Sequence, residues 1–452
     1  MKVLILSHLY PSKSNPVYGI FVHQQTRQLV EEGIDVKVIA PVPYSPEILH
    51  FQEKWSNYAE IPYRETIDNV DVYHPRYIIL PRKLLFGFSG YNYYFGVKGI
   101  VEEIYKDFKF DMIHAHVALP DGFAGIMLKD IYHCPLITTI HGDDVNNIVY
   151  RNRRCRENIV RVFQESDHIV ANSERTKRKV NEFYKENDNN NDGVSVVYNG
   201  ISSDKIKDVP GVQVRDGSGI QAKVGSRVQV NDSDLETVQG TGSGDKIVLT
   251  VGSLRKSKGI DYAIRAMSEV EKQYPDFKHL IIGQGPERQN LEQLAAELGI
   301  SDKVEFLGSK SNDQVMEYMS NCELFLLPSW NEAFGMVYLE ALACGKPIIG
   351  CKGQGVEEII GDDSSLDDSF NDYSLDGSSG NSNKDGSSNT ARAGFLVRPK
   401  DIIDIKEKVL CLLNDEHLAV EMGRTGQNRV LKEFTWEKTI SDLIRVYQKV
   451  NR

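Results

Sequence analysis

Short apolar runs and longer amphipathic stretches alternate along the whole chain. The apolar runs are mostly four to seven residues long and rich in Val, Ile and Leu, which is typical of strands buried on both faces of a parallel sheet. The stretches between them repeat their apolar residues at the spacing of a helix that packs on one side. This alternation predicts βαβ units and therefore an α/β fold.

The units fall into two series, which we expect to form two Rossmann-like domains at residues 1–200 and 201–434. In the first series we expect strands at 2–7, 35–40, 70–74, 111–117, 135–140, 167–171 and 194–198, and helices at 19–32, 92–108, 120–130, 152–165 and 173–186. In the second we expect strands at 246–251, 279–283, 303–307, 323–327, 347–350 and 394–397, and helices at 258–272, 286–298, 312–320, 335–344, 401–413 and 415–432. Apolar residues at helical spacing also predict a terminal helix at 435–452, which we expect to return to the first domain.

Two stretches of the second series lack a sustained core pattern. Residues 208–244 are rich in Gly, Ser, Asp, Val and Gln, and their alternating piece could form a small hairpin. Residues 361–390 hold seven Asp, nine Ser and one Lys, a net charge of −6. Because this second stretch has too few apolar residues to offset the ordering entropy, we expect a disordered surface loop.

Composition excludes several classes of protein. The net charge of the 452 residues is −11, so no chain-wide basic field is available to hold a nucleic acid. Six cysteines occur without a C-x-x-C pair, and no HExxH motif is present, so these residues indicate no metal site. No apolar run is long enough for a signal peptide or a membrane span. We therefore expect a cytoplasmic protein.

The segment 324–350 carries the most specific chemistry. A buried strand ends near Pro328, a short loop carries Glu332, and a helix is expected to begin near Gly335. The unpaired N–H groups of the first helical turn and the positive end of the helix dipole would then form an anion site. Glu340 lies eight residues after Glu332, ~12 Å along a helix, so the two carboxylates should contact different parts of an elongated ligand. For Glu340 alone, an ordinary solvated acid is an equally open interpretation.

Six stretches, taken in order, resemble glycosyltransferase family 4, whose members are retaining enzymes of the GT-B fold. The resemblance covers nearly the whole chain except the two insertions and implies two facing Rossmann-like domains with a cleft between them. The stretches are MKVLILSHLYP at the start, HAHVALPDG at 114–122, VGSLRKSKGID at 251–261, GQGPERQNLEQLA at 283–295, VEFLG at 304–308, and E-x7-E at 332–340 followed by CGKPII.

The resemblance implies roles for residues of the second domain. Glu332 would hold hydroxyls of the donor hexose, Lys258 would neutralise the leaving diphosphate, and Glu340 would accept from the ribose. The amides of Phe334, Gly335, Met336 and Val337 would bind the sugar and the diphosphate. Many relatives have Arg where this chain has Ser253. Two interpretations of Arg255 are open: it replaces that cation, or it is a solvated loop residue.

In the first domain, the strand before residue 117 places His114 and His116 on one face. The resemblance implies that His116 contacts the donor sugar, whereas His114 is expected to pack or to bond the backbone. Gly19 can let a backbone amide approach the donor, although the family often has two adjacent glycines there. On the acceptor side, the loop at 141–144 offers His141, Asp143 and Asp144.

The resemblance thus predicts a hexosyltransferase that uses a UDP- or GDP-linked sugar as co-substrate, with no cofactor and no required metal. The acceptor would be a hydroxyl of a glycan or lipid-linked glycan in cell-surface polysaccharide or glycolipid synthesis. Basic clusters at 76–83 and 151–161 suggest peripheral contact with anionic lipid. Two alternatives stay open. One is a nucleotide-sugar epimerase on the same fold. The other is a non-catalytic nucleotide-sugar-binding subunit, which is consistent with Ser253 in place of the family's Arg.

Overall fold

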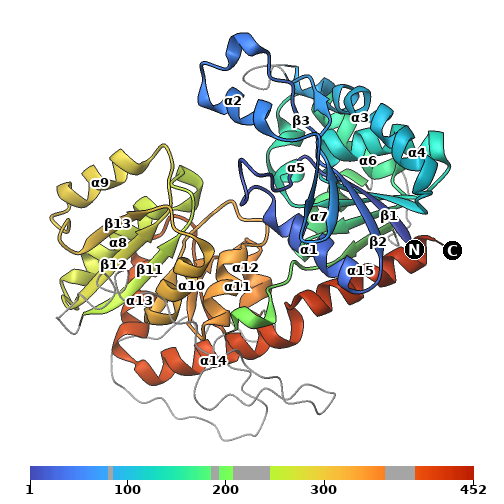
Figure 1. Ribbon diagram of the computed structural model, residues 1–452. Coiled ribbons are helices and arrows are strands. Elements are labelled where there is room, and N and C mark those ends of the chain that lie inside the picture. The colour runs from blue at the N-terminus through green and yellow to red at the C-terminus, as the bar shows by residue number, and fades with distance from the viewer. Residues whose placement is uncertain (80–84, 185–192, 207–244, 362–391, 452) are drawn as a thin grey trace, which may run out of the picture. The chain divides into compact units, whose positions relative to one another are not determined.

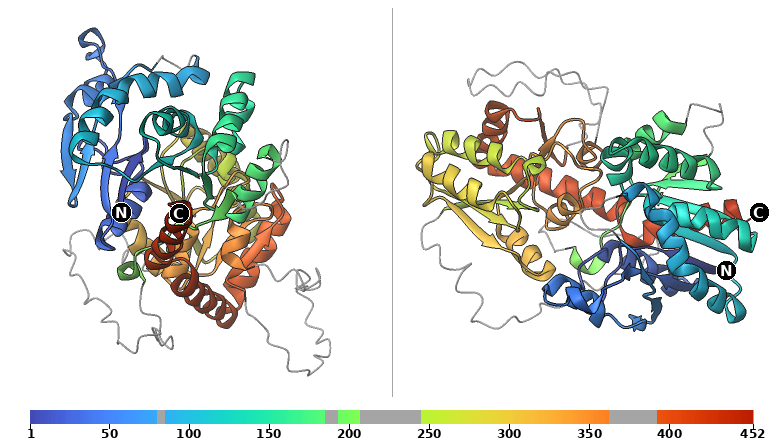
Figure 2. Two further views of the ribbon diagram at one scale, coloured as in Figure 1. Left: turned by 90° about the vertical axis from the view of Figure 1, so that its right-hand side faces the viewer. Right: turned by 90° about the horizontal axis from the view of Figure 1, so that it is seen from above.

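The computed structural model describes residues 1–79, 85–184, 193–206, 245–361 and 392–451. The chain divides into two compact units, one of Met1–Gly200 with Trp436–Arg452 and the other of Ile201–Thr435 (Figure 1). Each unit is a largely parallel sheet with helices on both of its faces (Figures 1 and 2). The predicted α/β class is confirmed. The insertion 208–244 and all but the first residue of 361–390 lie outside the described residues, as do Arg82 and Lys83.

The first unit is built on a sheet in the order β10-β9-β8-β7-β1-β2-β5-β4, in which only β4 is antiparallel to its neighbour among the described strands. Its strands are β1 (Lys2–Leu6), β2 (Asp35–Ile39), β4 (Arg64–Ile67), β5 (Val70–Tyr73), β7 (Met112–His116), β8 (Leu136–Ile140), β9 (His168–Ala171) and β10 (Val194–Val196), and β3 (Val42–Pro43) pairs separately with β6 (Arg76–Tyr77). Its helices are α1 (Ile20–Glu31), α2 (Glu53–Glu60), α3 (Ser89–Asp107), α4 (Phe123–Tyr132), α5 (Asp143–Asn146), α6 (Arg153–Glu165), α7 (Glu174–Tyr184) and α15 (Trp436–Val450).

Alternation along β1 divides the core of this unit into two layers. Leu4 and Leu6 belong to an apolar cluster with side chains of α3, α4 and α6. Val3 and Ile5 point to the opposite face and pack with α1 and α15. The terminal helix predicted from apolar spacing is therefore present, and its Leu443 and Tyr447 are fully buried in the first unit.

The second unit has a parallel sheet in the order β13-β12-β11-β14-β15-β16. Its strands are β11 (Lys246–Val251), β12 (Phe277–Ile282), β13 (Val304–Gly308), β14 (Leu324–Leu326), β15 (Ile348–Cys351) and β16 (Gly394–Val397). Its helices are α8 (Ile260–Glu271), α9 (Arg288–Glu297), α10 (Asn312–Asn321), α11 (Met336–Ala343), α12 (Val356–Ile360), α13 (Ile402–Asn414) and α14 (Glu416–Glu433).

In each sheet, successive strands are added first toward one edge and then toward the other, so the strand order has one switch point. In the first unit the switch point lies between β1 and β7, and in the second it lies between β11 and β14. Ligands of open α/β sheets bind outside the carboxyl ends of the strands at such a switch point. The loops that follow these four strands carry most of the residues singled out from the sequence.

Candidate active site

In the second unit, the turn after β11 packs against the loop after β14. Gly259, at φ +69°, ends a tight turn over Lys256–Lys258, and a Cβ placed on it would lie 2.3 Å from the carbonyl oxygen of Pro328. The Trp330 N–H donates to the Ser257 carbonyl at 3.0 Å. Only glycine permits this approach, which brings together two loops that are more than 70 residues apart in the chain.

The contact between these loops places Lys258 beside Glu332. The Lys258 Nζ donates to Glu332 Oε2 at 2.5 Å, and the two side chains are only 21% and 15% exposed. Behind them, the Glu332 N–H donates to Gln354 Oε1 at 3.0 Å. The family resemblance singled out both charged residues but gave no signal for Gln354, which follows a different strand, β15.

Helix α11 begins where the sequence predicted. Gly335 precedes its first residue at φ +92°, and a Cβ there would meet the Tyr338 ring at 2.5 Å. The buried Tyr338 hydroxyl donates to the Leu327 carbonyl at 2.6 Å, so the first turn is fixed to the end of the central strand. The first-turn N–H groups of Met336 and Val337 therefore lie beside the loop that carries Glu332, in a geometry suited to an anion.

Glu340 is half-buried and hydrogen-bonded. Its Oε1 accepts from Asn312 Nδ2 at 3.0 Å, and Asn312 in turn accepts from Lys205. Burial raises the pKa of Glu340, while the Asn312 hydrogen bond and the charge of Lys205 oppose that rise. A partly desolvated carboxylate held by an amide can accept further hydroxyl bonds. Neither partner was anticipated from the sequence.

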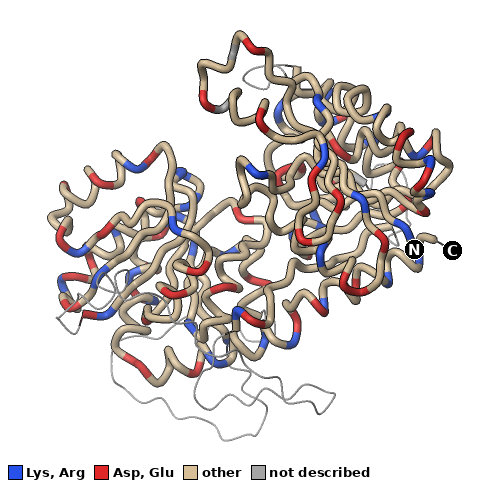
Figure 3. Tube along the Cα trace, in the orientation of Figure 1, with Lys and Arg blue, Asp and Glu red and all other residues tan. Residues whose placement is uncertain are grey.

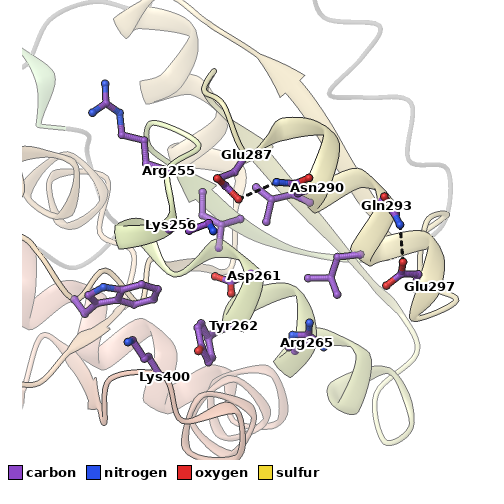
Figure 4. Close-up of a pocket in the computed structure, with 14 residues that line it drawn as sticks. Arg255, Lys256, Asp261, Tyr262, Arg265, Glu287, Asn290, Gln293, Glu297 and Lys400 are labelled. Carbon is purple, nitrogen blue, oxygen red and sulfur yellow. Dashed lines mark hydrogen bonds between the residues drawn. The ribbon is translucent and has the colours of Figure 1, made fainter. Parts of the chain in front are cut away.

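Arg255 and Ser253 are both exposed. Arg255 lines a groove of about 520 Å³ beside helices α8 and α9, together with Lys256, Trp330 and Lys400. The Arg255 guanidinium points away from the acidic side chains of this groove (Figure 4). Neither Lys258 nor Glu332 lines it, so this groove is separate from the Lys258–Glu332 pair.

The GQGP segment forms a tight turn between β12 and α9, as predicted. A Cβ on Gly283 would lie 1.9 Å from the Gly252 carbonyl oxygen, and one on Gly285 would lie 2.3 Å from that of Leu254. The two glycines let this turn contact the segment that leads to Lys258. They hold the segment that leads to Lys258 close to this turn.

In the first unit, the fully buried His116 contacts the half-buried His141 at the ends of β7 and β8. His116 Nδ1 lies 3.0 Å from His141 Nε2, and the rings stack with their planes 8° apart. Burial lowers the pKa of His116 well below its usual value and that of His141 to about 4, so both rings are neutral near pH 7. Within the described residues, His116 Nε2 is buried without a hydrogen-bond partner, so its hydrogen-bonding capacity is unused, which is uncommon for a buried polar atom.

His114 has a structural role, in keeping with the prediction that it packs. Its Nδ1 bonds the Tyr447 hydroxyl at 2.7 Å and its Nε2 bonds the Thr139 hydroxyl at 2.7 Å. Both partners are side chains rather than backbone groups. The ring therefore ties α15 to the sheet of the first unit.

Gly19 and the two acidic residues of the 141–144 loop occupy different environments. Gly19, at φ +68°, precedes α1, and a Cβ on it would lie 2.4 Å from the Leu9 carbonyl oxygen. Asp143 is exposed and accepts from Asn147. Asp144 is fully buried and accepts the Ala118 N–H at 3.1 Å. Asp144 thus holds the turn after β7.

A further buried pair was missed by sequence reasoning. The Asp121 carboxylate, fully buried after β7, accepts the His8 N–H at 2.7 Å and lies 2.5 Å from His8 Nδ1. This pair joins the loops on the two sides of the switch point between β1 and β7. HAHVALPDG and SHLYP were noted as motifs, but no local pattern pairs residues 113 positions apart.

The basic clusters are largely engaged within the first unit. Arg153 and Arg161 form i,i+4 pairs with Glu157 and Glu165, and Arg154 stacks over the Phe88 ring at 4.0 Å. Arg76 donates to backbone carbonyls. Basic and acidic residues are interspersed along the described trace (Figure 3). Among the described residues, no helix is long and apolar enough to cross a membrane, and no cluster of three His, Cys, Asp or Glu side chains suits a metal ion.

Two family models match different parts of the chain. Residues 19–205 match the family model for Glycosyltransferase Family 4, and residues 233–371 match the model for Glycosyl transferases group 1. The chain belongs to the family 4 glycosyltransferases. This family 4 enzyme is 26% identical to an uncharacterized glycosyltransferase of Methanocaldococcus jannaschii, over 92% of this chain and 99% of that protein. It is also 26% identical to N-acetyl-alpha-D-glucosaminyl L-malate synthase of Bacillus anthracis, over 76% of this chain and 75% of that protein.

Solved structures of GT-B enzymes share the fold of this family 4 enzyme. The crystal structure of Anabaena HepE in complex with UDP-glucose aligns with a TM-score of 0.66 and 16% identity, over 99% of this chain and 100% of that chain. The predicted GT-B fold is therefore confirmed. Of the predicted site residues, Gly19, His116, His141, Asp143 and Asp144 belong to the first unit, and the donor-side residues from Arg255 to Glu340 belong to the second.

Proposed function

We propose that this family 4 glycosyltransferase moves a hexose from a nucleotide diphosphate sugar to a hydroxyl of a glycan or glycolipid, with retention of anomeric configuration, in cell-surface polysaccharide or glycolipid synthesis. The observation that carries the proposal is the Lys258–Glu332 contact beside the first turn of α11. One cation and unpaired amides next to a carboxylate suit a diphosphate joined to a polyhydroxyl ring. The UDP-glucose complex of HepE supports the same class of donor.

In the proposed reaction, the bond between the sugar C1 and the β-phosphate oxygen breaks, and a bond from C1 to the acceptor oxygen forms on the same face. The acceptor proton passes to a phosphate oxygen of the leaving group. Lys258 and the amides of Phe334, Gly335, Met336 and Val337 stabilise the charge on the departing diphosphate. Glu332 and His116 hold sugar hydroxyls, and Glu340 accepts from the ribose.

We further propose that the transfer requires no cofactor and no metal ion, since the protein's own cation and amides would balance the charge on the diphosphate. Arg255 is the residue best placed in sequence to add a second cation, and movement of its loop would be needed to bring it to the diphosphate. Transfer rates with and without EDTA test this point. A loss of activity that Mg²⁺ restores would contradict it.

A thermal-shift panel of UDP- and GDP-linked sugars tests the donor, because a ligand that binds only the folded state raises the melting temperature. The best donor is then incubated with candidate glycan acceptors, and the configuration of the product is read by NMR. An α-linked product from an α-linked donor supports the proposal, and an inverted product contradicts it. Conversion of the donor sugar without any acceptor would instead indicate an epimerase.

Peripheral contact with anionic lipid, expected from the basic clusters, stays a prediction. Because Arg153 and Arg161 are already paired with glutamates, we expect any binding to vesicles to be weak and to disappear at high salt. Sedimentation with vesicles of neutral or anionic lipid at two salt concentrations measures it. Recovery of all the protein in the supernatant at both would exclude a lipid-surface role.

A further inference from the structure

The first unit contains a second feature at the carboxyl edge of its sheet, a cavity of about 350 Å³. Its walls come from the loop after β1, from helix α2 and from the β5–β6 segment, each represented by a tyrosine, Tyr18, Tyr58 and Tyr77. This size lies at the lower end of the range for small-molecule sites, roughly 300–1,000 Å³. It suits one or two compact rings better than a long chain.

Aromatic rings on rigid elements dominate the cavity. Tyr77 is buried and held edge-on by the Tyr93 ring, with centroids 5.6 Å apart. Tyr10 also lines the wall, and its hydroxyl is occupied by His23 Nδ1 at 2.9 Å. Tyrosine offers a flat apolar face and a hydroxyl at little cost in side-chain entropy. Such faces complement the apolar face of a sugar ring, whose hydroxyls can reach serine and asparagine side chains at the rim.

Among the described residues that line the cavity, none is Lys, Arg, Asp or Glu. The two ring bases in its wall already have acceptor partners. His74 bonds the Ala40 carbonyl and the Glu65 carboxylate, each at 2.8 Å, and His8 Nδ1 faces the buried Asp121. Because Asp121 matches any charge on His8, an entering carboxylate or phosphate would find no unpaired cation in this wall.

The negative charge of Asp121 also disfavours an anionic ligand in this cavity. Burial, assisted by the charge of Asp121, raises the pKa of Tyr18 to about 12. The same two causes raise the pKa of Tyr77 well above its usual value. The tyrosines are neutral hydroxyls near pH 7, and the Asp121 charge that disfavours their ionisation would also disfavour an anion beside them. An anion placed here would lose its hydration without a cation among the described lining residues to compensate it, which costs several kcal/mol.

We propose that this cavity binds an uncharged sugar ring, and that the acceptor of this enzyme therefore presents a neutral glycosyl unit rather than a carboxylate or a phosphate to the first unit. The inference rests on the proposed function in one respect only, that the bound ring is the acceptor. Binding of a neutral ring can be measured without a donor, so the two ideas can fail separately.

Saturation-transfer NMR on the full-length protein compares three probes at equal concentration, methyl β-glucoside, glucuronate and L-malate. We expect methyl β-glucoside to bind at least fivefold more strongly than either anion. Tyr58→Ala should weaken that binding at least fivefold, because it removes a ring from the wall. Tyr63→Ala is the matched control, since this tyrosine is 52% exposed and does not line the cavity.

A charge insertion gives the converse test. Asn57, which lies on α2 in the cavity wall, is replaced by Lys, and this variant should bind glucuronate at least as well as methyl β-glucoside. If Tyr58→Ala does not fold, sugar binding is measured instead with Tyr58→Phe, which keeps the ring and removes only the hydroxyl. Preference of the wild type for either anion, or equal binding by Tyr58→Ala and the wild type, would overturn the proposal.

Donor chemistry separates this result from the proposed function. Slow hydrolysis of the nucleotide sugar by the wild type, with water as the acceptor, measures donor turnover without any sugar acceptor. Hydrolysis without neutral-sugar binding would reject the cavity assignment alone. Neutral-sugar binding without any turnover of UDP- or GDP-sugars would reject the proposed function alone.

Discussion

At the scale of single residues, the Lys258–Glu332 pair has two possible meanings. Partly buried ion pairs also occur for structural reasons, and a pair that is 21% and 15% exposed adds little net stability after desolvation. Its position at the switch point between β11 and β14 distinguishes it. In the absence of a ligand the two side chains neutralise each other, and a donor would exchange this contact for its diphosphate and hydroxyls.

The first prediction tests that exchange. Glu332→Gln and Lys258→Ala should each lower kcat at least tenfold, because each removes a charge that complements the reacting groups. Lys256→Ala, in the same turn but exposed, should retain most of the activity. Steady-state kinetics with a saturating donor measures the three variants. Near-normal kcat in both site variants would rule out the assigned site.

The second prediction concerns Asp144. Burial, the largest cause, raises the pKa of this carboxyl to about 7, above the value of about 4 expected in the unfolded chain. The folded state therefore holds its proton more tightly, so the contribution of Asp144 to stability is fully present below pH 4 and is lost as the pH rises to 7. The loss between pH 5 and pH 8 is roughly 2–3 kcal/mol.

Asp144→Asn should remove this loss, since an amide can still accept from the Ala118 N–H. Its free energy of unfolding should fall less than that of the wild type between pH 5 and pH 8, as measured by denaturant titration at both pH values. Asp143→Asn, at the exposed neighbouring position, should follow the wild type. Parallel behaviour of the wild type and Asp144→Asn would show that Asp144 is ionised in the folded state.

The sequence named candidate site residues, whose roles stay predictions, but it did not give their contacts. The likeness to the family singled out Glu332, Lys258 and His116, and periodicity placed His114 and His116 on one strand face. The bonds of His116 to His141 and of His8 to Asp121 join loops after different strands. Such pairs depend on strand order in the sheet, which no local pattern records.

At the scale of elements, apolar periodicity performed best where a strand is buried on both faces. The strand expected at 246–251 is Lys246–Val251, and the helix expected at 335–344 is Met336–Ala343. The strands β3, β4 and β6 were missed. Two of them have only two residues, and the edge strand β4 shows no fully buried position, so none carries the apolar run by which strands were recognised.

The third prediction concerns the turn before α8. Gly259 and Gly299 have similar backbone angles, φ +69° and +74°, but a Cβ meets the Pro328 carbonyl at the first and nothing within 4 Å at the second. Gly299→Ala should cost only the left-handed strain, about 1–2 kcal/mol, with kcat unchanged. Gly259→Ala should cost more and lower kcat at least fivefold, because it separates the Lys258 turn from the Glu332 loop.

Thermal melting and steady-state kinetics on both variants measure this difference. The comparison isolates close packing from backbone strain, since the two positions share the strain. Equal stability and equal kcat in the two variants would show that the contact between the loops does not support the site.

At the scale of the whole molecule, charge is distributed unevenly along the sequence. Residues 361–390 supply −6 of the net charge of −11. In the sequence they lie between β15 and β16, which are paired neighbours in the sheet of the second unit. Their flanks are held together, because the Ala393 N–H donates to the Ile360 carbonyl at 3.4 Å. A short connection could therefore join the flanks without moving either strand.

The fourth prediction is that residues 362–391 can be replaced by a short Gly-Ser turn without loss of fold or activity. The segment has few apolar residues to bury, and shortening a loop whose ends already meet changes mainly the closure entropy, which varies slowly with length. The melting temperature should stay within a few degrees of the wild-type value, and kcat/KM within twofold.

A matched variant of full length, with the seven Asp of this segment changed to Asn, separates charge from length. If the short variant loses activity and the full-length neutral variant keeps it, the segment itself contributes to the active enzyme; loss in both would assign that contribution to its negative charge.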